Sequence, residues 1–349
     1  MIRRELWHVV VPWKRTLKTP GGEHGASYAL LVRLREAGGR EGLGYAYAMS
    51  ARVIDRIAEA AHRLAPRDDC TLAQLLDVER LDDRSPACNR ASRAAASALS
   101  TAAWDLLGKR SGRSCADLWG KCAGRDAIDA YASGLFLGGS ADDLMREARE
   151  YRAQGFRRVK MRGGRSSSED LACYAAVCSA FADQRSVAVD FVFKSDASSV
   201  NDFVAAAVSP PMWIEDPVAY EHLGAIQAIE LVAGGEACRT TAELMRMHDA
   251  GVGQAILDLQ VLGGPLRFLE AARVLNALGC RVGSHTFAHE SPHLLATLPA
   301  SMPVEVLDWW NALYEEPVRP DDQGRLAVRG PGFGFTLREE TLAAHGKKL

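Results

Sequence analysis

The sequence lacks several features that would assign it to a particular class of protein. Among its 349 residues there is no CxxC pair, and the eight cysteines fit no zinc spacing, so we expect them to be reduced and mostly buried. No apolar run approaches the roughly 20 residues that a membrane-spanning helix needs. The start, MIRRELWHVVVPW, has neither the apolar core nor the cleavage site of a signal peptide. With a net charge of −2 as well, we expect a cytoplasmic protein that binds neither membranes nor nucleic acids.

What the sequence does contain is a large apolar fraction arranged in two successive patterns. With 48% hydrophobic residues, the chain can fill a large core and form two domains. Residues 1–50 predict strands within HVVVPW and YALLVRLRE, joined by a long loop over 14–25. Residues 51–110 are rich in alanine and leucine at helical spacing. We therefore expect an α+β first domain over 1–124.

From Ala127 onward, short apolar runs alternate with helix-like segments. Such runs are typical of parallel strands buried on both faces, and eight of them with intervening helices predict a (β/α) barrel over 125–316. The tail, 317–349, contains turn sequences (RPDDQGR and GPGFG) and is expected to return to the first domain. The eight predicted strands lie in DAYASG, FRRVKMR, SVAVDF, MWIEDP, LVAGGE, AILDLQ, RVGSH and VEVLDWW.

Three consecutive strands end in carboxylates. Asp190, Glu215 and Glu236 are 25 and then 21 residues apart. Neighbouring strand ends lie side by side in a barrel, and catalytic side chains sit at the C-terminal ends of its strands. Each acid alone could cap the following helix or pair with an arginine. For all three together we favour a shared site for Mg²⁺, which prefers carboxylate oxygens.

The last three predicted strands carry another set of polar ends. His285 ends the seventh strand and Asp258 the sixth, so the aspartate can hold the imidazole in one tautomer and stabilise its protonated form. Beside a carboxylate site, we predict His285 as the catalytic base rather than as a satisfied polar residue. Glu305, at the eighth strand, either hydrogen-bonds a reaction intermediate or is a solvated strand end.

The second barrel strand carries two cations. Lys160 and Arg162 alternate, so both point to the same side of the barrel. Either side chain could bind a substrate carboxylate or phosphate, but Arg162 cannot readily give up its proton. The alternative for both is a structural ion pair with barrel carboxylates.

These residues together resemble the enolase superfamily and, within it, the mandelate racemase subgroup. SALSTAAWDLLGKRSGRSCADLWG resembles a helix of that family's capping domain, and GPGFGF resembles its C-terminal segment. The family's metal ligands fall on Asp190, Glu215 (in WIEDP) and Glu236 (in GGE). Its histidine–aspartate pair and strand-eight glutamate fall on His285 (in GSHTF), Asp258 (in LDLQVLGG) and Glu305 (in EVLDWW).

The resemblance implies a (β/α)7β TIM-like barrel with an α+β N-terminal capping domain that the C-terminal tail completes. It implies Mg²⁺-assisted removal of the proton α to a carboxylate, giving an enediolate bound by the metal. It also implies a homo-oligomer whose capping loops close the barrel mouth.

Two positions depart from the family pattern. The usual lysine–any–lysine is Lys160-Met161-Arg162 here, which argues against two-base racemisation. The usual Asp-any-Asn is Asp190-Phe191-Val192, so a polar contact often made near the substrate α-hydroxyl is missing.

We therefore predict a hydro-lyase that eliminates water from an acid sugar or a related hydroxy acid. His285 would take the α-proton and then protonate the departing hydroxyl. The alternatives are a racemase, an epimerase or a cycloisomerase on a similar acid, and, from another class, a silent paralogue that only binds an acid. Specificity is expected in the first-domain loop, unless that loop is simply a solvated basic turn. The residues singled out there are Trp13, Lys14, Arg15, Lys18 and His24.

Overall fold

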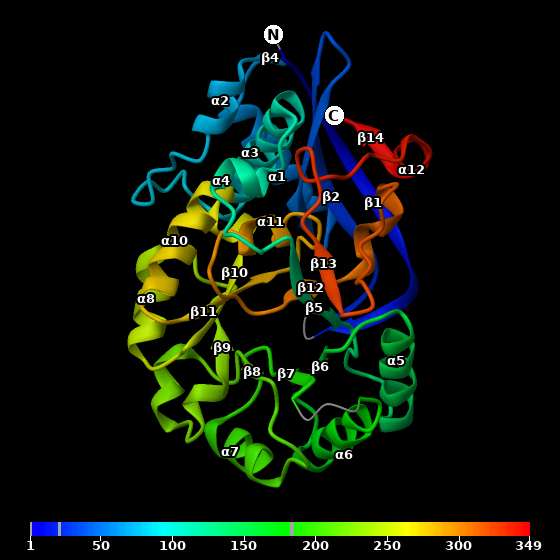
Figure 1. Cartoon of the computed structure of the whole chain (residues 1–349), viewed down its shortest axis with the longest axis vertical. Helices are drawn as coiled ribbons and strands as arrows, with labels where there is room; N and C mark the ends of the chain where they lie inside the picture. Colours follow the sequence, from blue (N-terminus) through cyan, green and yellow to red (C-terminus); the bar gives the residue numbers. More distant parts are fainter. Residues whose placement is uncertain (1, 20–21, 182–184) are drawn as a thin grey trace.

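The structure, a computed structural model, describes residues 2–19, 22–181 and 185–349, without the side chains at 14, 15, 18 and 19. Lys14, Arg15 and Lys18 therefore lie outside the described side chains. Figure 1 shows an antiparallel sheet with its helices at one end of the molecule and a ring of strands and helices at the other. Within the described residues, no helix is both long and apolar enough to cross a membrane.

The first sheet is built around a long hairpin. Its strand order is β14-β1-β2-β3, and β4 (Asp69–Cys70) also pairs with β1. The hairpin strands are β1 (Ile2–Thr19) and β2 (Gly22–Glu36), and β3 (Glu41–Ala48) follows in antiparallel register.

The prediction of a long loop over 14–25 was wrong. The first strand extends to Thr19 and the second begins at Gly22, with Leu17 paired to His24 and Lys18 to Glu23. A register shift between Pro12 and Leu17 absorbs the unpaired residues. The composition suggested a loop, but continuing the ladder satisfies backbone groups that a loop would leave unpaired.

The helices of the first part pack closely on this sheet. The longest, α3 (Arg90–Ser111), begins at Asn89, whose side chain accepts from Ala91 N and Ser92 N. Its alanine-rich face touches β3 at a glycine: a Cβ on Gly44 would lie 2.4 Å from the Ala98 carbonyl oxygen. The neighbouring helices are α1 (Ala51–Leu64), α2 (Leu72–Asp77) and α4 (Cys115–Trp119).

A parallel sheet curls into a nearly closed barrel. In the described part of the chain it runs in the order β11-β10-β9-β8-β7-β6-β5-β12, as the sequence predicted. Between β11 and β12, which flank the closing seam, Met302 N donates to the Val282 carbonyl at 2.8 Å. The strands are β5 (Ala127–Ser133), β6 (Val159–Arg162), β7 (Val187–Asp190), β8 (Ile214–Glu215), β9 (Val232–Gly234), β10 (Gln254–Asp258), β11 (Arg281–His285) and β12 (Val304–Val306).

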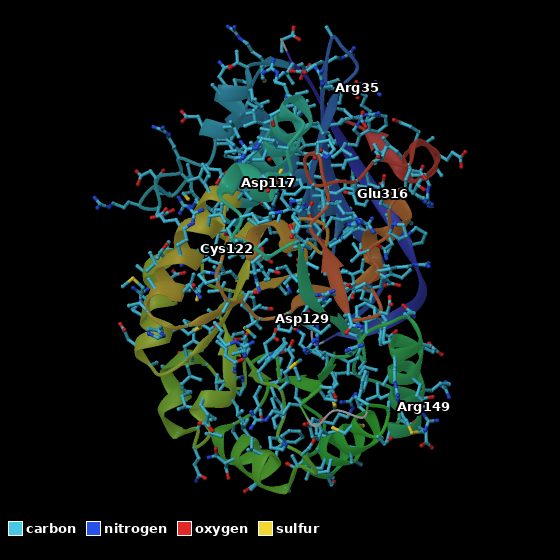
Figure 2. All side chains as sticks on the ribbon, in the orientation of Figure 1. Arg35, Asp117, Cys122, Asp129, Arg149 and Glu316 are labelled. Carbon is cyan, nitrogen blue, oxygen red and sulfur yellow. The ribbon has the colours of Figure 1, made fainter. Side chains whose placement is uncertain are left out.

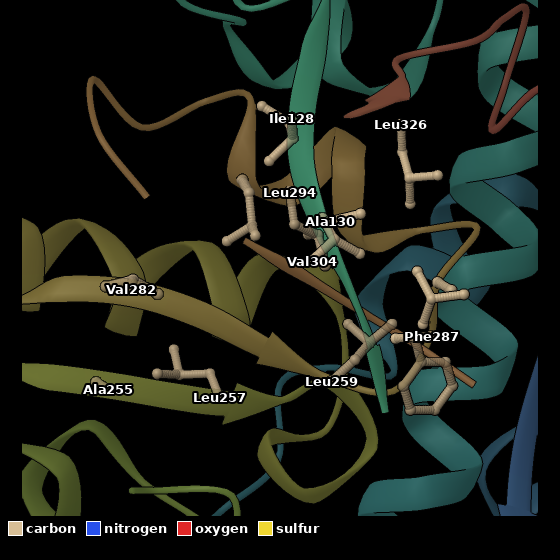
Figure 3. Close-up of a cluster of buried hydrophobic side chains, with 14 of the residues drawn as sticks. Ile128, Ala130, Ala255, Leu257, Leu259, Val282, Phe287, Leu294, Val304 and Leu326 are labelled. Atoms are coloured by element: carbon tan, nitrogen blue, oxygen red, sulfur yellow. The ribbon is translucent and has the colours of Figure 1, made fainter. Parts of the chain in front are cut away.

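Helices surround the barrel and bury the outer faces of its strands. Figure 3 shows Ile128 of β5 and Val304 of β12 close to Leu294, and Val282 of β11 farther from them in the same buried cluster. Inside the barrel a separate apolar cluster includes Tyr131 and Trp213. The surrounding elements are α5 (Ala141–Ala153), α6 (Ser167–Cys178), α7 (Ala197–Ala206), η1 (Tyr220–Ala225), η2 (Ile229–Leu231), α8 (Thr241–Asp249), α9 (Leu259–Leu262), α10 (Pro265–Ala277), α11 (Ser291–Leu295) and η3 (Asp308–Leu313).

The C-terminal tail joins both parts of the molecule. β13 (Arg325–Ala327) pairs with β5 of the barrel, and β14 (Gly346–Lys348) pairs with β1 of the first sheet. Between them, α12 (Glu339–His345) begins with Glu339, which forms an ion pair with Arg33. The predicted fold class, a TIM-like barrel with an α+β first part that the tail completes, is confirmed.

One buried acid gives a stability prediction. Glu290, at the start of α11, is 0% exposed, and neither carboxylate oxygen has a hydrogen-bond partner in another described residue. Burial raises its pKa to about 8. The native state therefore binds this proton more tightly than the unfolded chain. The contribution of protonated Glu290 to the free energy of unfolding is therefore fully present below about pH 4.5, and it is lost as the pH rises through about 8.

Glu290→Gln should accordingly stabilise the protein at high pH and have little effect near pH 4. The expected gain at pH 9 is on the order of a few kcal/mol, because each pKa unit is worth about 1.4 kcal/mol. Thermal unfolding across this pH range tests it, with Glu59→Gln on the exposed face of α1 as the control. A variant less stable than the wild type at pH 9 would contradict the prediction.

Candidate active site

The predicted polar strand ends lie at one end of the barrel. In the parallel register, Arg162 is opposite Asp190, and Asp190 is opposite Glu215. On the other side of the ring, Asp258 is opposite His285. The pairing thus brings side chains from six strands, counting Glu305 of β12, towards one region.

His285 and Asp258 form a close pair. The imidazole Nδ1 lies 2.6 Å from Asp258 Oδ2. Asp258 Oδ1 accepts from the backbone N–H groups of Gln260 and Val261, each at 2.8 Å, so the carboxylate is held from both sides. The other ring nitrogen, Nε2, is 3.3 Å from Glu236 Oε2. Burial disfavours the charged ring, but Glu236 and Asp258 outweigh it and raise the pKa of His285 to about 10.

Lys160 lies at the centre of three carboxylates, those of Asp190, Glu215 and Glu305, which we call the acidic cluster. Its side chain is fully buried, and Nζ lies 2.6 Å from Glu215 Oε1, 2.9 Å from Glu305 Oε1 and 3.5 Å from Asp190 Oδ2. Burial lowers the lysine pKa, but Glu215 and Glu305 raise it more, so the net direction is well upward. This geometry corresponds to the ion-pair alternative considered for Lys160.

Arg162 lies at the edge of the same cluster. Its Nε is 3.4 Å from Asp190 Oδ2, its terminal nitrogens are 3.4 Å from Ser133 Oγ, and its guanidinium lies over the Phe136 ring at 5.1 Å. Burial lowers its pKa, but Asp190 and Glu305 reverse the direction and raise it. The guanidinium is thus held as a cation.

The remaining carboxylates have distinct partners. Glu215 Oε2 accepts from Trp213 Nε1 at 2.9 Å, and Asp190 Oδ1 accepts from Val192 N. Glu305 Oε2 accepts from the backbone N–H of Thr286 at 2.8 Å. Lys160 neutralises part of this charge, and burial raises the pKa of Glu215 against the lysine's opposing effect.

The carboxylates suit a hard divalent cation by chemistry rather than by their present arrangement. Asp190 and Glu215 offer oxygen donors from the ends of neighbouring strands, and Glu236 offers them from the turn two residues after β9 rather than from the predicted strand end. No group of three acidic, histidine or cysteine side chains in the described part of the chain is gathered tightly enough to ligate an ion as it stands. Lys160 draws Asp190 and Glu215 together, whereas Glu236, 26% exposed, is directed to His285. The oxygen donors fit Mg²⁺ by their chemistry. In this structure the Lys160 ammonium balances the charge of Asp190 and Glu215 instead.

The first sheet also reaches this region, through Tyr47. The Gln260 amide makes two hydrogen bonds to the Tyr47 backbone, at 3.0 and 3.3 Å. The Tyr47 hydroxyl is 3.5 Å from Thr286 Oγ1, and its ring packs against Phe287 at 5.7 Å. Tyr47 therefore contacts the residues that follow both members of the His285–Asp258 pair.

Of the loop residues predicted for specificity, Trp13 has a defined place. Its Nε1 donates to Ser27 Oγ at 2.7 Å, and its ring stacks on Trp309 with centroids 4.8 Å apart. Trp309 belongs to η3, immediately after β12, so Trp13 is anchored beside the end of a barrel strand. His24 lies on β2 opposite Leu17, half-buried. No contact of His24 with the acidic cluster is recorded among the described residues.

Sequence reasoning missed four residues of this region. Asp216 is buried beside Glu215 in the IEDP segment, which was a usable signal, and it accepts from the Tyr220 hydroxyl at 3.1 Å. Burial and the neighbouring carboxylates raise its pKa well above the usual value. Tyr47, Gln260 and Trp309 gave no sequence signal, because their roles depend on contacts between distant segments.

Comparison with known proteins agrees with this architecture. Residues 2–120 match the model "Mandelate racemase / muconate lactonizing enzyme, N-terminal domain", and residues 143–341 match "Enolase C-terminal domain-like". A 3,6-anhydro-alpha-L-galactonate cycloisomerase of Streptomyces coelicolor is 28% identical over 98% of this chain and 97% of its own length. An L-talarate/galactarate dehydratase of Salmonella typhimurium is 26% identical over 89% of this chain and 81% of its own.

A solved structure extends the likeness. The racemase from Streptomyces coelicolor A3(2) with bound magnesium has a TM-score of 0.86 at 25% identity, covering 99% of both chains. Family models thus match both the sheet-bearing first part and most of the barrel, and the structural match spans almost the whole chain. The chain belongs to the enolase superfamily, in its mandelate racemase and muconate lactonizing enzyme group.

Proposed function

We propose that the protein is a Mg²⁺-dependent hydro-lyase that removes water from an acid sugar or a related hydroxy acid to give a keto acid. The observation that carries the proposal is the His285–Asp258 pair facing the acidic cluster: one imidazole, held at Nδ1, with its second nitrogen directed inwards. Relatives named as dehydratase and cycloisomerase, and a neighbour with bound magnesium, support this general chemistry.

Asp190, Glu215 and Glu236 would hold the cation. When bound, Mg²⁺ supplies positive charge where the substrate carboxylate becomes more negative as the α-proton leaves. It would also offset the effect of Glu236 on the imidazole. The pKa of His285 would then move from about 10 towards the range in which a base works at neutral pH.

His285 then transfers protons through one ring nitrogen, the one that faces Glu236. Asp258 fixes Nδ1, so Nε2 is the atom that takes the α-proton. The C–H electrons form the new double bond, the C–O bond breaks, and the imidazolium proton joins the departing hydroxyl as water. The resulting enol becomes the keto acid. A single histidine suffices, because the ring that is protonated by taking the α-proton can then act as the acid for the departing hydroxyl.

Arg162 favours this elimination over racemisation. Inversion by two bases needs a second base near neutral pKa, whereas a free guanidinium has a pKa above about 12. Here the neighbouring carboxylates raise the pKa of Arg162 further. Arg162 and Lys160 therefore act as fixed cations that balance the carboxylates and attract an acidic substrate.

A screen of acid sugars tests the proposal. With Mg²⁺ present, at least one acid should yield an α-keto acid, detected as its semicarbazone, and a chelator should abolish the reaction. The same incubation in D₂O should leave unreacted substrate without inversion at the α-carbon. Efficient inversion without loss of water would show a racemase or epimerase, and an isomer formed by ring opening would show a cycloisomerase. Mg²⁺-dependent binding without any turnover would indicate an acid-binding paralogue.

A further inference from the structure

The barrel has a second polar layer. It lies at the end opposite the catalytic cluster, by which we mean the His285–Asp258 pair together with the acidic cluster. Residues two apart on a strand point to the same side, so each of three neighbouring strands carries one inward-facing series from end to end. In each series, the last residue lies at the catalytic end and the first at the opposite end. The series are Asp129–Tyr131–Ser133 on β5, Lys160–Arg162 on β6 with Arg158 just before the strand, and Ala188–Asp190 on β7 with Ser186 just before it.

A cavity lies at this opposite end. It has a volume of about 580 Å³ and is lined by Asp129, Arg157, Arg158, Arg185, Ser186, Gln323 and Arg325. Four of these side chains are arginines and one is an aspartate. Asp129, labelled in Figure 2, lies on β5 directly opposite Arg325 of β13, so the barrel and the C-terminal tail both contribute to the wall.

The arginines are only partly neutralised. Arg158 Nη2 is 3.2 Å from Asp129 Oδ2, while its Nη1 is buried without a hydrogen-bond partner in the described chain. Arg157 donates to the carbonyl of Asp322 at 2.7 Å, which satisfies an N–H but no charge.

The other two arginines complete the charge count. Arg325 pairs with Asp321, at 3.2 Å, from outside the cavity. Arg185 is exposed and makes no recorded ion pair with any other described residue. Among the residues that the structure describes, the four guanidinium groups form ion pairs with two carboxylates, those of Asp129 and Asp321, which leaves an excess of two positive charges in this set.

We propose that this cavity, the basic cavity hereafter, binds a small organic dianion through its arginines. Guanidinium groups match the paired oxygens of phosphate and carboxylate in charge and geometry. The volume falls within the roughly 300–1,000 Å³ of small-molecule sites, which exceeds the needs of a bare inorganic anion. A phosphate monoester and a dicarboxylate share the required chemistry.

The basic cavity is distinct from the catalytic cluster. Asp129 and Ser133 are four residues apart on β5, which corresponds to about 13 Å along the strand. Tyr131 and Ala188, both buried, fill the barrel between the two layers. A ligand in the basic cavity therefore leaves His285 and the strand-end carboxylates free.

Calorimetric titration of the full chain with small anions tests the proposal, with Mg²⁺ present in the buffer throughout. The probes are glycerol 3-phosphate for a phosphate monoester, succinate for a dicarboxylate and inorganic phosphate for the bare anion, all at constant ionic strength. At least one organic probe should bind more tightly than inorganic phosphate. Arg158→Gln and Arg185→Gln should each weaken that binding about tenfold or more. Arg149→Gln, on the exposed face of α5 (Figure 2), should not alter it.

The outcomes separate clearly. Binding by only one organic probe assigns the ligand to that chemical class. Equal affinity in the wild type and both cavity variants would place the ligand elsewhere, including at the catalytic cluster, and would overturn the proposal. So would failure of both organic probes to bind. Because Arg185 is exposed and has no recorded ion-pair partner in the described chain, Arg185→Gln should keep the native circular dichroism spectrum, and its result remains interpretable if Arg158→Gln misfolds.

Discussion

Replacing His285 with asparagine should stop exchange of the substrate α-proton with solvent deuterium. Asparagine keeps much of the volume and can still hydrogen-bond Asp258, 2.6 Å away in the native pair, but it cannot take up a proton. General base catalysis typically contributes about 10²–10⁴-fold, and we expect a loss in the upper part of that range. Exchange is followed by NMR of the α-proton signal in D₂O with Mg²⁺ present.

Two further variants make this experiment specific. Asp258→Asn should reduce exchange less completely, because the imidazole remains but loses its orienting carboxylate. His222→Asn, at an exposed position in η1, should exchange at the wild-type rate. Undiminished exchange in the His285 variant would place the base elsewhere, with Lys160 as the next candidate.

Replacing Glu236 with alanine should abolish turnover without unfolding the protein. The side chain is only partly buried; its removal gives up the contact with His285 but relieves like-charge repulsion with the neighbouring acids, so the chain without metal should stay folded with little change in stability. The wild type should gain about 2.7 kcal/mol when Mg²⁺ reaches 100 times its dissociation constant. Glu236→Ala should lose most of that gain.

Thermal unfolding with and without Mg²⁺ measures this difference directly. Glu270→Ala, on the exposed face of α10, is the control and should retain both activity and the Mg²⁺-dependent stabilisation. Full activity of Glu236→Ala in the presence of a chelator would refute both the ligand assignment and the requirement for the metal.

The barrel was predictable because its determinants are local. Each strand is a short apolar run followed by a polar residue, as in VAVD ending at Asp190 and RVGSH ending at His285, and the parallel register then fixes which ends are neighbours. The same reasoning failed for the predicted loop over 14–25, where residues 17–19 and 22–24 pair as strands despite their loop-like composition. Pairing between strands is a property of two segments, and the composition of either one does not reveal it.

The side-chain arrangement within the site was less predictable. The strand-two pattern indicated that Lys160 and Arg162 face inwards, but not that Lys160 contacts three carboxylates at once. The contact of Tyr47 with Gln260 joins residues 213 positions apart, which no local pattern encodes. The basic cavity was not predicted for another reason: an arginine just before a strand, such as Arg158, is equally compatible with a solvated position.

The pairing of β14 with β1 has a consequence for the order in which the molecule is made. Ala48 completes β3, yet Gly346, which begins the strand that covers the edge of β1, is added about 300 residues later. At about 5–20 residues per second, a ribosome needs roughly 15–60 s for that interval. Over residues 7–9, β1 would then be an uncovered sheet edge, a surface to which other nascent chains can add. We expect chaperone crosslinks to this edge in stalled nascent chains, and their loss once the final strand leaves the ribosomal tunnel.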